Sequence, residues 1–130
     1  MAIGGFVFGY SRIRPALAAR VIGVVSPEKI KIVRAATAIV EQILAKSGAF
    51  QYMAILHNDR VTGMRAGKRE FGLQIELRCW DSVDARKATP TQLPYSILRK
   101  LSARIVKEVP GVVSVTYNIT TKPPSTMEVV

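Results

Sequence analysis

Between Pro94 and Pro110 the apolar positions recur every three or four residues, and basic residues occupy most of the remaining positions. This spacing predicts a helix with one buried face and one basic face. The buried face consists of Ile97, Leu98, Leu101, Ile105 and Val106. Pro110 and Gly111 end the helix, because proline cannot continue it and glycine accepts a left-handed turn. The alternation that follows predicts a strand with Val113, Val115, Tyr117 and Ile119 on its buried face.

A second amphipathic helix is predicted to begin at Ser26 and Pro27 and to end at residues 46–48, which read Lys-Ser-Gly. Serine is a good side-chain cap, proline suits the first turn, and Glu28 lies near the positive end of the helix dipole. The apolar face of this helix consists of Ile32, Val33, Ala36, Ile39, Val40, Ile43 and Leu44.

Three further stretches have the pattern of strands: residues 20–25, 52–57 and 69–81. Residues 2–8 are a short apolar run that we interpret as an edge strand or a docking arm, and residues 85–92 are predicted to be a loop. The longest strand alternates, with an apolar face of Phe71, Leu73, Ile75, Leu77 and Cys79. Its other face is polar but carries Trp80, and we expect a second subunit to cover it.

The order of these elements predicts one α+β domain over residues 1–130, built as a two-layer sandwich with a mainly antiparallel sheet. The chain has 130 residues, 48% of them hydrophobic, which is enough for a real core. Its single cysteine, Cys79, excludes an intramolecular disulfide and a thiolate metal cluster. No apolar run reaches the roughly 20 residues of a membrane helix. We therefore predict a cytoplasmic protein with no membrane association.

The formal net charge of +10 favours an anionic partner, such as a nucleotide, a nucleic acid or an acidic protein face. A solvated basic surface without any ligand is the alternative. Residues 63–69 combine glycine with Arg65, Lys68 and Arg69, and we interpret them as a flexible hairpin loop whose tip contacts phosphate or RNA backbone, or as a solvated turn. A phosphate-binding P-loop is excluded, because the spacing is one residue short and no Ser or Thr follows the lysine.

The sequence predicts no catalytic residue, no metal site and no cofactor. His57 and Asp59 lack a second histidine or an activated nucleophile beside them, so a structural role is the better interpretation. We expect Asp81 and Asp84 to order the loop that follows the long strand by pairing with Arg78.

The end of the chain, residues 122–128, reads KPPSTME. It resembles the C-terminal dimerisation domain of GMP synthase, whose members end in K-P-P-x-T-x-E-W-E. Five positions match in order and spacing: Lys122, Pro123, Pro124, Thr126 and Glu128. The resemblance extends through residues 93–95, 77–84 and 17–23, so it covers about residues 15–128, and residues 1–14 diverge.

The resemblance implies two helices on one face of a three- to four-stranded sheet, in a layout related to KH folds. It also implies a non-catalytic homodimer that acts in GMP biosynthesis. Its tail, which binds xanthosine monophosphate (XMP), would be supplied to a separate ATP-pyrophosphatase subunit. The phosphate contacts carried over are Lys122, Thr126, Glu128 and Arg20. A different class of function stays open, a basic KH-like module that binds RNA or another polyanion. The charge favours it, and the lack of a G-x-x-G loop between two helices speaks against it.

Overall fold

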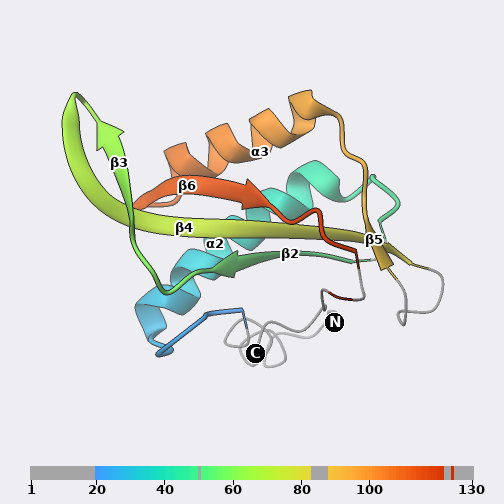
Figure 1. The fold of residues 1–130 in the computed structure, drawn as a ribbon, viewed down its shortest axis with the longest axis horizontal. Coiled ribbons are helices and arrows are strands. Elements are labelled where there is room, and N and C mark those ends of the chain that lie inside the picture. The colour runs from blue at the N-terminus through green and yellow to red at the C-terminus, as the bar shows by residue number, and fades with distance from the viewer. Residues whose placement is uncertain (1–19, 50, 83–87, 122–123, 125–130) are drawn as a thin grey trace.

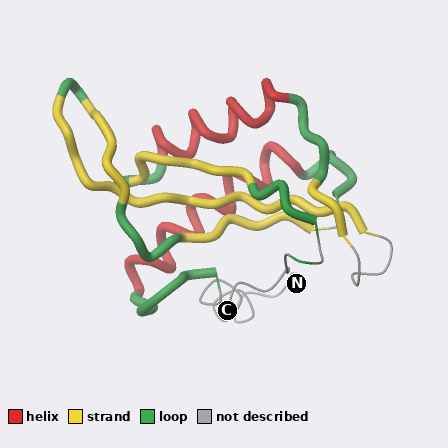
Figure 2. Tube along the Cα trace, viewed as in Figure 1, coloured by secondary structure: helices red, strands yellow, loops and turns green. Residues whose placement is uncertain are grey.

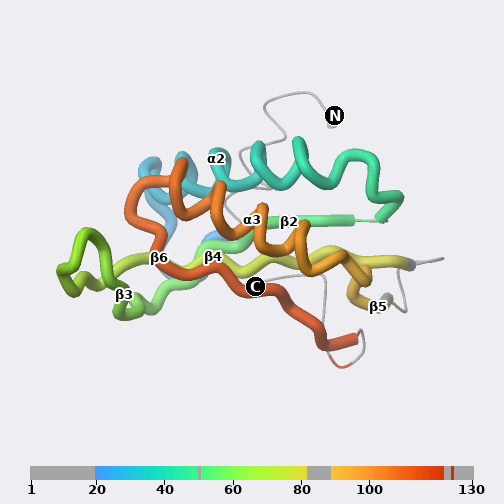
Figure 3. Tube along the Cα trace, turned by 90° about the horizontal axis from the view of Figure 1, so that it is seen from above, coloured from blue at the N-terminus to red at the C-terminus, as the bar shows by residue number. Residues whose placement is uncertain are grey.

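The computed structural model describes residues 20–49, 51–82, 88–121 and 124. Two helices, α2 (Pro27–Leu44) and α3 (Tyr95–Glu108), cover one face of a five-stranded sheet (Figure 1). Viewed from above, both helices lie on the same side of the strands (Figure 3). The predicted α+β two-layer sandwich is confirmed. The sheet has one strand more than the upper number that the resemblance implied, because short segments on both sides of the long strand also pair with it.

The long strand β4 is the centre of the sheet and pairs with every other strand (Figure 2). Its partners β2, β3 and β5 run antiparallel to it, and β6 runs parallel. The bounds are β2 (Gln51–Leu56), β3 (Val61–Arg65), β4 (Lys68–Ser82), β5 (Ala88–Pro90) and β6 (Val112–Tyr117). The sheet is therefore mainly antiparallel, as predicted.

Helix α2 begins where the sequence predicts. The Ser26 side chain accepts a hydrogen bond from the backbone N–H of Lys29 at 3.2 Å, Pro27 occupies the first turn, and Glu28 lies near the positive end of the dipole. The face toward the sheet is buried through Val33, Ala36, Ile39, Val40 and Leu44. The capping residues and the apolar spacing thus indicate the same helix, and for this reason it could be predicted from the sequence.

The core lies between the two helices and one face of β4. Leu101 and Ile105 of α3 are fully buried, as is Ile75 of β4, and Leu77 and Cys79 are nearly so. Burying one such Leu or Ile side chain stabilises the fold by roughly 1.5–3 kcal/mol. The predicted apolar face of β4 is confirmed from Leu73 onward, where the helices cover it.

Phe71 departs from this prediction, since its side chain is 72% exposed. It belongs to the hairpin of β3 and β4, which projects beyond the ends of both helices (Figure 1). Alternation predicts which residues share a face, but it does not indicate how far the helices extend over that face. Phe71 therefore lies on the predicted side of the strand without being covered.

The predicted strand at residues 20–25 is wrong beyond its first residues. Val21 alone forms a bridge, parallel to Leu56, and is buried. Gly23 then adopts φ +96°, a left-handed conformation that turns the chain away from the sheet. Val24 is consequently 79% exposed, although its apolar character indicated a strand.

Two segments of the C-terminal half also differ from expectation. Residues 85–92 were predicted to be a loop, but Ala88–Pro90 pairs with the end of β4 as strand β5, where the missing N–H of proline is tolerated at an edge. Strand β6 ends at Tyr117, so Ile119 is 77% exposed instead of buried. A register shift beside Leu73 brings Val112 into the core in place of Val113.

Trp80 is 1% exposed within a single chain, so its burial does not depend on a second subunit, and the expectation that a second subunit covers the polar face of this strand stays a prediction. It lies near the end of β4, between Gln51 of β2 and Pro90 of β5. No helix among the described residues is long and apolar enough to cross a membrane.

Candidate functional site

The polar residues of β4 gather on the face of the sheet that the helices leave uncovered. Gln74, Glu76 and Arg78 alternate with the core residues Ile75 and Leu77, and successive strand side chains point to opposite faces. Among them Glu76 is only 8% exposed, so a carboxylate is buried on this face. Such a group requires hydrogen-bond partners to be tolerated.

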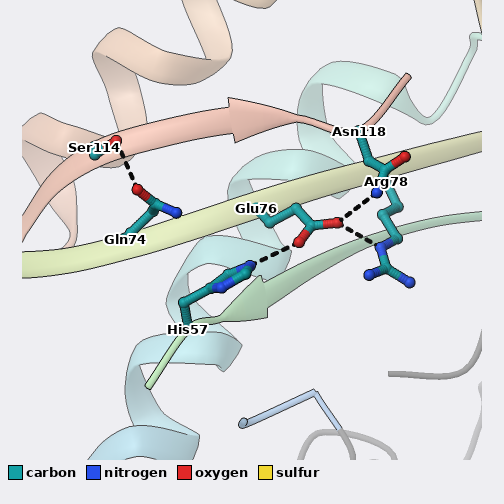
Figure 4. A network of polar contacts seen from close by, with 6 residues as sticks. All are labelled: His57, Gln74, Glu76, Arg78, Ser114 and Asn118. Atoms are coloured by element: carbon teal, nitrogen blue, oxygen red, sulfur yellow. Dashed lines mark hydrogen bonds and ion pairs between the residues drawn. The ribbon is translucent and has the colours of Figure 1, made fainter. Parts of the chain in front are cut away.

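Glu76 obtains these partners from three segments of the chain (Figure 4). Its Oε1 atom accepts a hydrogen bond from His57 Nε2 at 2.6 Å. Its Oε2 atom accepts from Arg78 Nε at 2.5 Å and from Asn118 Nδ2 at 3.0 Å. We call these four residues the Glu76 network. It joins the end of β2, the middle of β4 and the first residue after β6.

Two opposing effects act on the pKa of Glu76. Burial disfavours the charged form and would raise the pKa, but the hydrogen bonds from Arg78, His57 and Asn118 outweigh it and lower the pKa. The carboxylate is therefore ionised at neutral pH and can only accept hydrogen bonds. It follows that His57 donates through Nε2 and that the amide nitrogen of Asn118, not its oxygen, faces Glu76.

Asn118 is the residue at which the chain leaves the sheet. Its backbone N–H donates to the Leu77 carbonyl oxygen at 2.9 Å and closes the ladder with β4. Its side-chain Oδ1 accepts from the backbone N–H of Thr120 at 2.9 Å, which forms a turn of the Asx type. Both ends of the Asn118 side chain are thus engaged, one by Glu76 and one by the departing backbone.

The predicted basic hairpin forms, but it is tighter than a flexible loop. Ala66 and Gly67, with φ +52° and +77°, make a two-residue turn between β3 and β4. Arg65 donates to Glu70 Oε1 at 2.6 Å and to the Val112 carbonyl oxygen at 2.9 Å. Lys68 and Arg69 are exposed and form no ion pair among the described residues. The hairpin therefore offers two cations to an anion instead of the three predicted.

Arg20 is separate from both groups. Its carbonyl oxygen accepts from the Leu56 N–H at 2.9 Å at the start of the described chain. Burial lowers the pKa of Arg20, and the Glu41 carboxylate opposes this shift, which indicates that the guanidinium lies toward α2. The structure does not bring Arg20 to the hairpin cations. Lys122, Thr126 and Glu128 lie outside the described residues, and their roles stay predictions.

The contacts of His57 and Asp81 bear on two further predictions. His57 pairs with Glu76 and not with Asp59, in agreement with a structural role. Asp81 accepts a hydrogen bond from Thr91 Oγ1 at 2.8 Å and Arg78 donates to Glu76, so the expected pairing of Arg78 with Asp81 and Asp84 stays a prediction. Asp84 lies outside the described residues. The described part of the chain contains no group of three or more His, Cys, Asp or Glu side chains that could hold a metal ion.

The Glu76 network was missed by the sequence analysis. Alternation does indicate that Glu76 and Arg78 share a face, and this was the available signal. The contribution of His57 and Asn118 depends on the pairing of β4 with β2 and β6, whose register places both residues opposite the middle of β4.

These features define a small α+β domain. A basic hairpin lies at one end of its sheet, and the face away from the helices holds a buried carboxylate beside the residue at which the chain leaves β6. A model of the GMP synthase C-terminal domain matches residues 38–129, so the chain belongs to this family. A GMP synthase [glutamine-hydrolyzing] of Aeropyrum pernix is 43% identical over 118 residues, covering 88% of this chain and 23% of that protein. A protein of Methanothermobacter thermautotrophicus that is named as one subunit of the same enzyme is 40% identical over 118 residues, covering 88% of this chain and 38% of that protein. The chain thus spans about a quarter to two fifths of the length of the relatives that it matches.

Proposed function

We propose that this chain is the non-catalytic C-terminal domain of a GMP synthase, which forms a homodimer and presents its tail to XMP held by an ATP-pyrophosphatase subunit. The observation that carries the proposal is the extent of the family match, residues 38–129, which includes the tail motif. Several archaeal relatives are named as one subunit of a GMP synthase, which supports a partner subunit as part of the assembly.

In this proposal the tail recognises the monophosphate of XMP. Lys122 supplies a mobile point charge that suits a phosphate group. Thr126 and Glu128, which match the family motif, complete the contact, and Arg20 adds a second cation. The domain itself contributes binding and positioning, and the chemical step takes place in the partner subunit.

Light scattering combined with an amination assay tests the assembly. The chain of 14.3 kDa should have twice this mass alone, and it should join an ATP-pyrophosphatase subunit that lacks its own C-terminal domain. The mixture should convert XMP to GMP with ammonia and ATP, whereas neither component should do so alone. A monomer that neither joins the subunit nor restores activity would overturn the proposal.

RNA binding is the second candidate, and one observation favours it. Lys68 and Arg69 project from the hairpin without ion pairs among the described residues, beside the exposed aromatic ring of Phe71. Cations next to an exposed ring suit a single-stranded nucleic acid. Binding of an RNA oligonucleotide that weakens steeply with salt, together with no binding of XMP by the assembled subunits, would favour this function.

A further inference from the structure

We propose that Glu76 and Asn118 are positioning residues that set the direction in which the chain leaves the sheet toward Lys122. This inference rests on the proposed function, because it assigns a role to the tail in XMP binding. The geometry on which it depends lies within described residues. It consists of the contacts at both ends of the Asn118 side chain.

The carboxylate of Glu76 is a rigid anchor. β4 is paired on both sides at this point, with Ile55 of β2 and Thr116 of β6 as the neighbours of Glu76. Hydrogen bonds from His57 at 2.6 Å and Arg78 at 2.5 Å hold the carboxylate itself. Its orientation is therefore fixed independently of the segment that follows β6.

Asn118 links this carboxylate to the backbone that follows β6, and Figure 4 shows its contact with Glu76. Its Nδ2 donates to Glu76 Oε2 at 3.0 Å, and this contact fixes the rotation of the side-chain amide. The opposite atom, Oδ1, then accepts from the Thr120 N–H at 2.9 Å and bends the chain. A change at Glu76 would release the amide, and the turn would lose its fixed direction.

The distance to the tail makes this direction important. Lys122 follows Asn118 by four residues, which span at most about 14 Å when extended. A change in the exit angle at Asn118 therefore shifts the region that the Lys122 side chain can reach by several ångströms, on the order of a whole hydrogen-bond length. A misplacement of this size is enough to lose a phosphate contact.

The direct test removes and then restores the hydrogen bond between Asn118 and Glu76. Asn118→Asp places a second carboxylate against Glu76 but keeps an acceptor for Thr120, so we expect the KM for XMP in the assembled enzyme to rise about tenfold, the loss of one charged hydrogen bond. Glu76→Gln combined with Asn118→Asp restores one carboxylate and one amide in exchanged places, and the carboxylate then serves as the acceptor for Arg78, which donates to the same Glu76 oxygen as Asn118 in the parent. This double variant should return the KM to within about threefold of the parent.

A matched control removes an ion pair elsewhere. Arg104 donates to Glu108 at 2.7 Å on the exposed face of α3, and Glu108→Gln removes one charge from that pair. It should leave the KM for XMP unchanged. If Asn118→Asp does not fold, Asn118→Ala, which removes both contacts without adding a charge, takes its place. A KM that stays at the parent value in a folded Asn118 variant, or that the double variant fails to restore, would overturn the inference.

A second measurement separates this inference from the proposed function. A spin label on Ser125→Cys broadens the NMR signals of those backbone amides that the tail approaches, and the buried Cys79 does not compete for the label. We expect a defined broadening pattern in the parent chain, its loss in Asn118→Asp, and its return in the double variant. If this series holds but the assembly does not bind XMP, only the proposed function fails. If the pattern is the same in all three chains, the positioning role fails.

Discussion

The two faces of β4 differ in how they are stabilised. Toward the helices, Ile75, Leu77 and Cys79 pack among apolar side chains and need no particular partner atom. Toward the open side, Glu76 depends on three specific donors at distances of 2.5–3.0 Å. Apolar packing tolerates small shifts, whereas a buried carboxylate loses its compensation if one donor moves. One strand thus carries the apolar residues of the core on one face and, on the other, a polar site that requires precise distances.

The largest effect is expected on the apolar face. Leu101→Ala removes a fully buried side chain from α3 and leaves a cavity against the sheet. We expect the free energy of unfolding to fall by about 3–5 kcal/mol, since alanine keeps the helix and the cavity cannot be refilled. Urea unfolding followed by circular dichroism measures this loss. A cost below about 1 kcal/mol would mean that α3 does not pack as described.

Glu76→Gln should have the next largest effect and should depend on pH. Gln retains the shape but not the charge that Arg78 and His57 face, so we expect a cost of about 2–3 kcal/mol at pH 7. Because the pKa of Glu76 is lowered in the folded state, its contribution is present above about pH 4.3, the value for an unfolded chain, and is lost as the pH falls further.

The pH series therefore compares the parent and Glu76→Gln by urea unfolding from pH 7 down to about pH 3. The difference in unfolding free energy should shrink below about pH 4.3. A difference that stays constant throughout would show that the charge of Glu76 does not stabilise the fold.

The hairpin also lies close to β6, because Gly63 and Gly72 both face Val113. A Cβ atom on Gly72 would lie 2.5 Å from Val113 Cγ1 and 2.9 Å from the Gly111 carbonyl oxygen. Gly72→Ala should therefore cost about 1–3 kcal/mol. In combination with Val113→Ala, which removes the nearest atoms, the cost of Gly72→Ala should fall. Strict additivity of the two changes in unfolding free energy would argue against this contact.

The smallest effect is expected in helix α2, and it is a gain in the free energy of unfolding instead of a loss. The hydroxyl oxygen of Thr37 is buried and has no hydrogen-bond partner among the described residues. Thr37→Val replaces it with a methyl group of similar size and equal helix propensity, so we expect a gain of about 1 kcal/mol. A shift of the thermal midpoint to higher temperature would agree with this expectation, and a loss of stability would indicate that the hydroxyl has a partner in solution.

The apolar face could be predicted from the sequence because periodicity is a local property. The caps at Ser26 and Pro27, the spacing through Leu101 and Ile105, and the alternation along β4 each required only neighbouring residues. The exposure of Phe71 and Val24 was missed, because it depends on where the helices end and on the turn at Gly23. Local patterns do not contain this information.

The open face was predictable only in part for the same reason. That Glu76 and Arg78 share a face follows from alternation, but the arrival of His57 and Asn118 depends on pairings with strands 19 and 42 residues away from Glu76. The tail motif was accessible through its likeness to a known family, which the match to residues 38–129 confirms. Its contacts stay a prediction.

The proposed contact between the tail and the phosphate of XMP is tested most directly by the dissociation constant of XMP from the assembled subunits. This constant is compared between the parent and Lys122→Ala. We expect Lys122→Ala to weaken binding by more than about tenfold, since a charged hydrogen bond contributes roughly 1.5–3 kcal/mol. Lys100→Ala, which removes an equal charge from the exposed surface of α3, should leave the constant unchanged. An identical dissociation constant for the parent and both variants would contradict a tail that holds the phosphate of XMP.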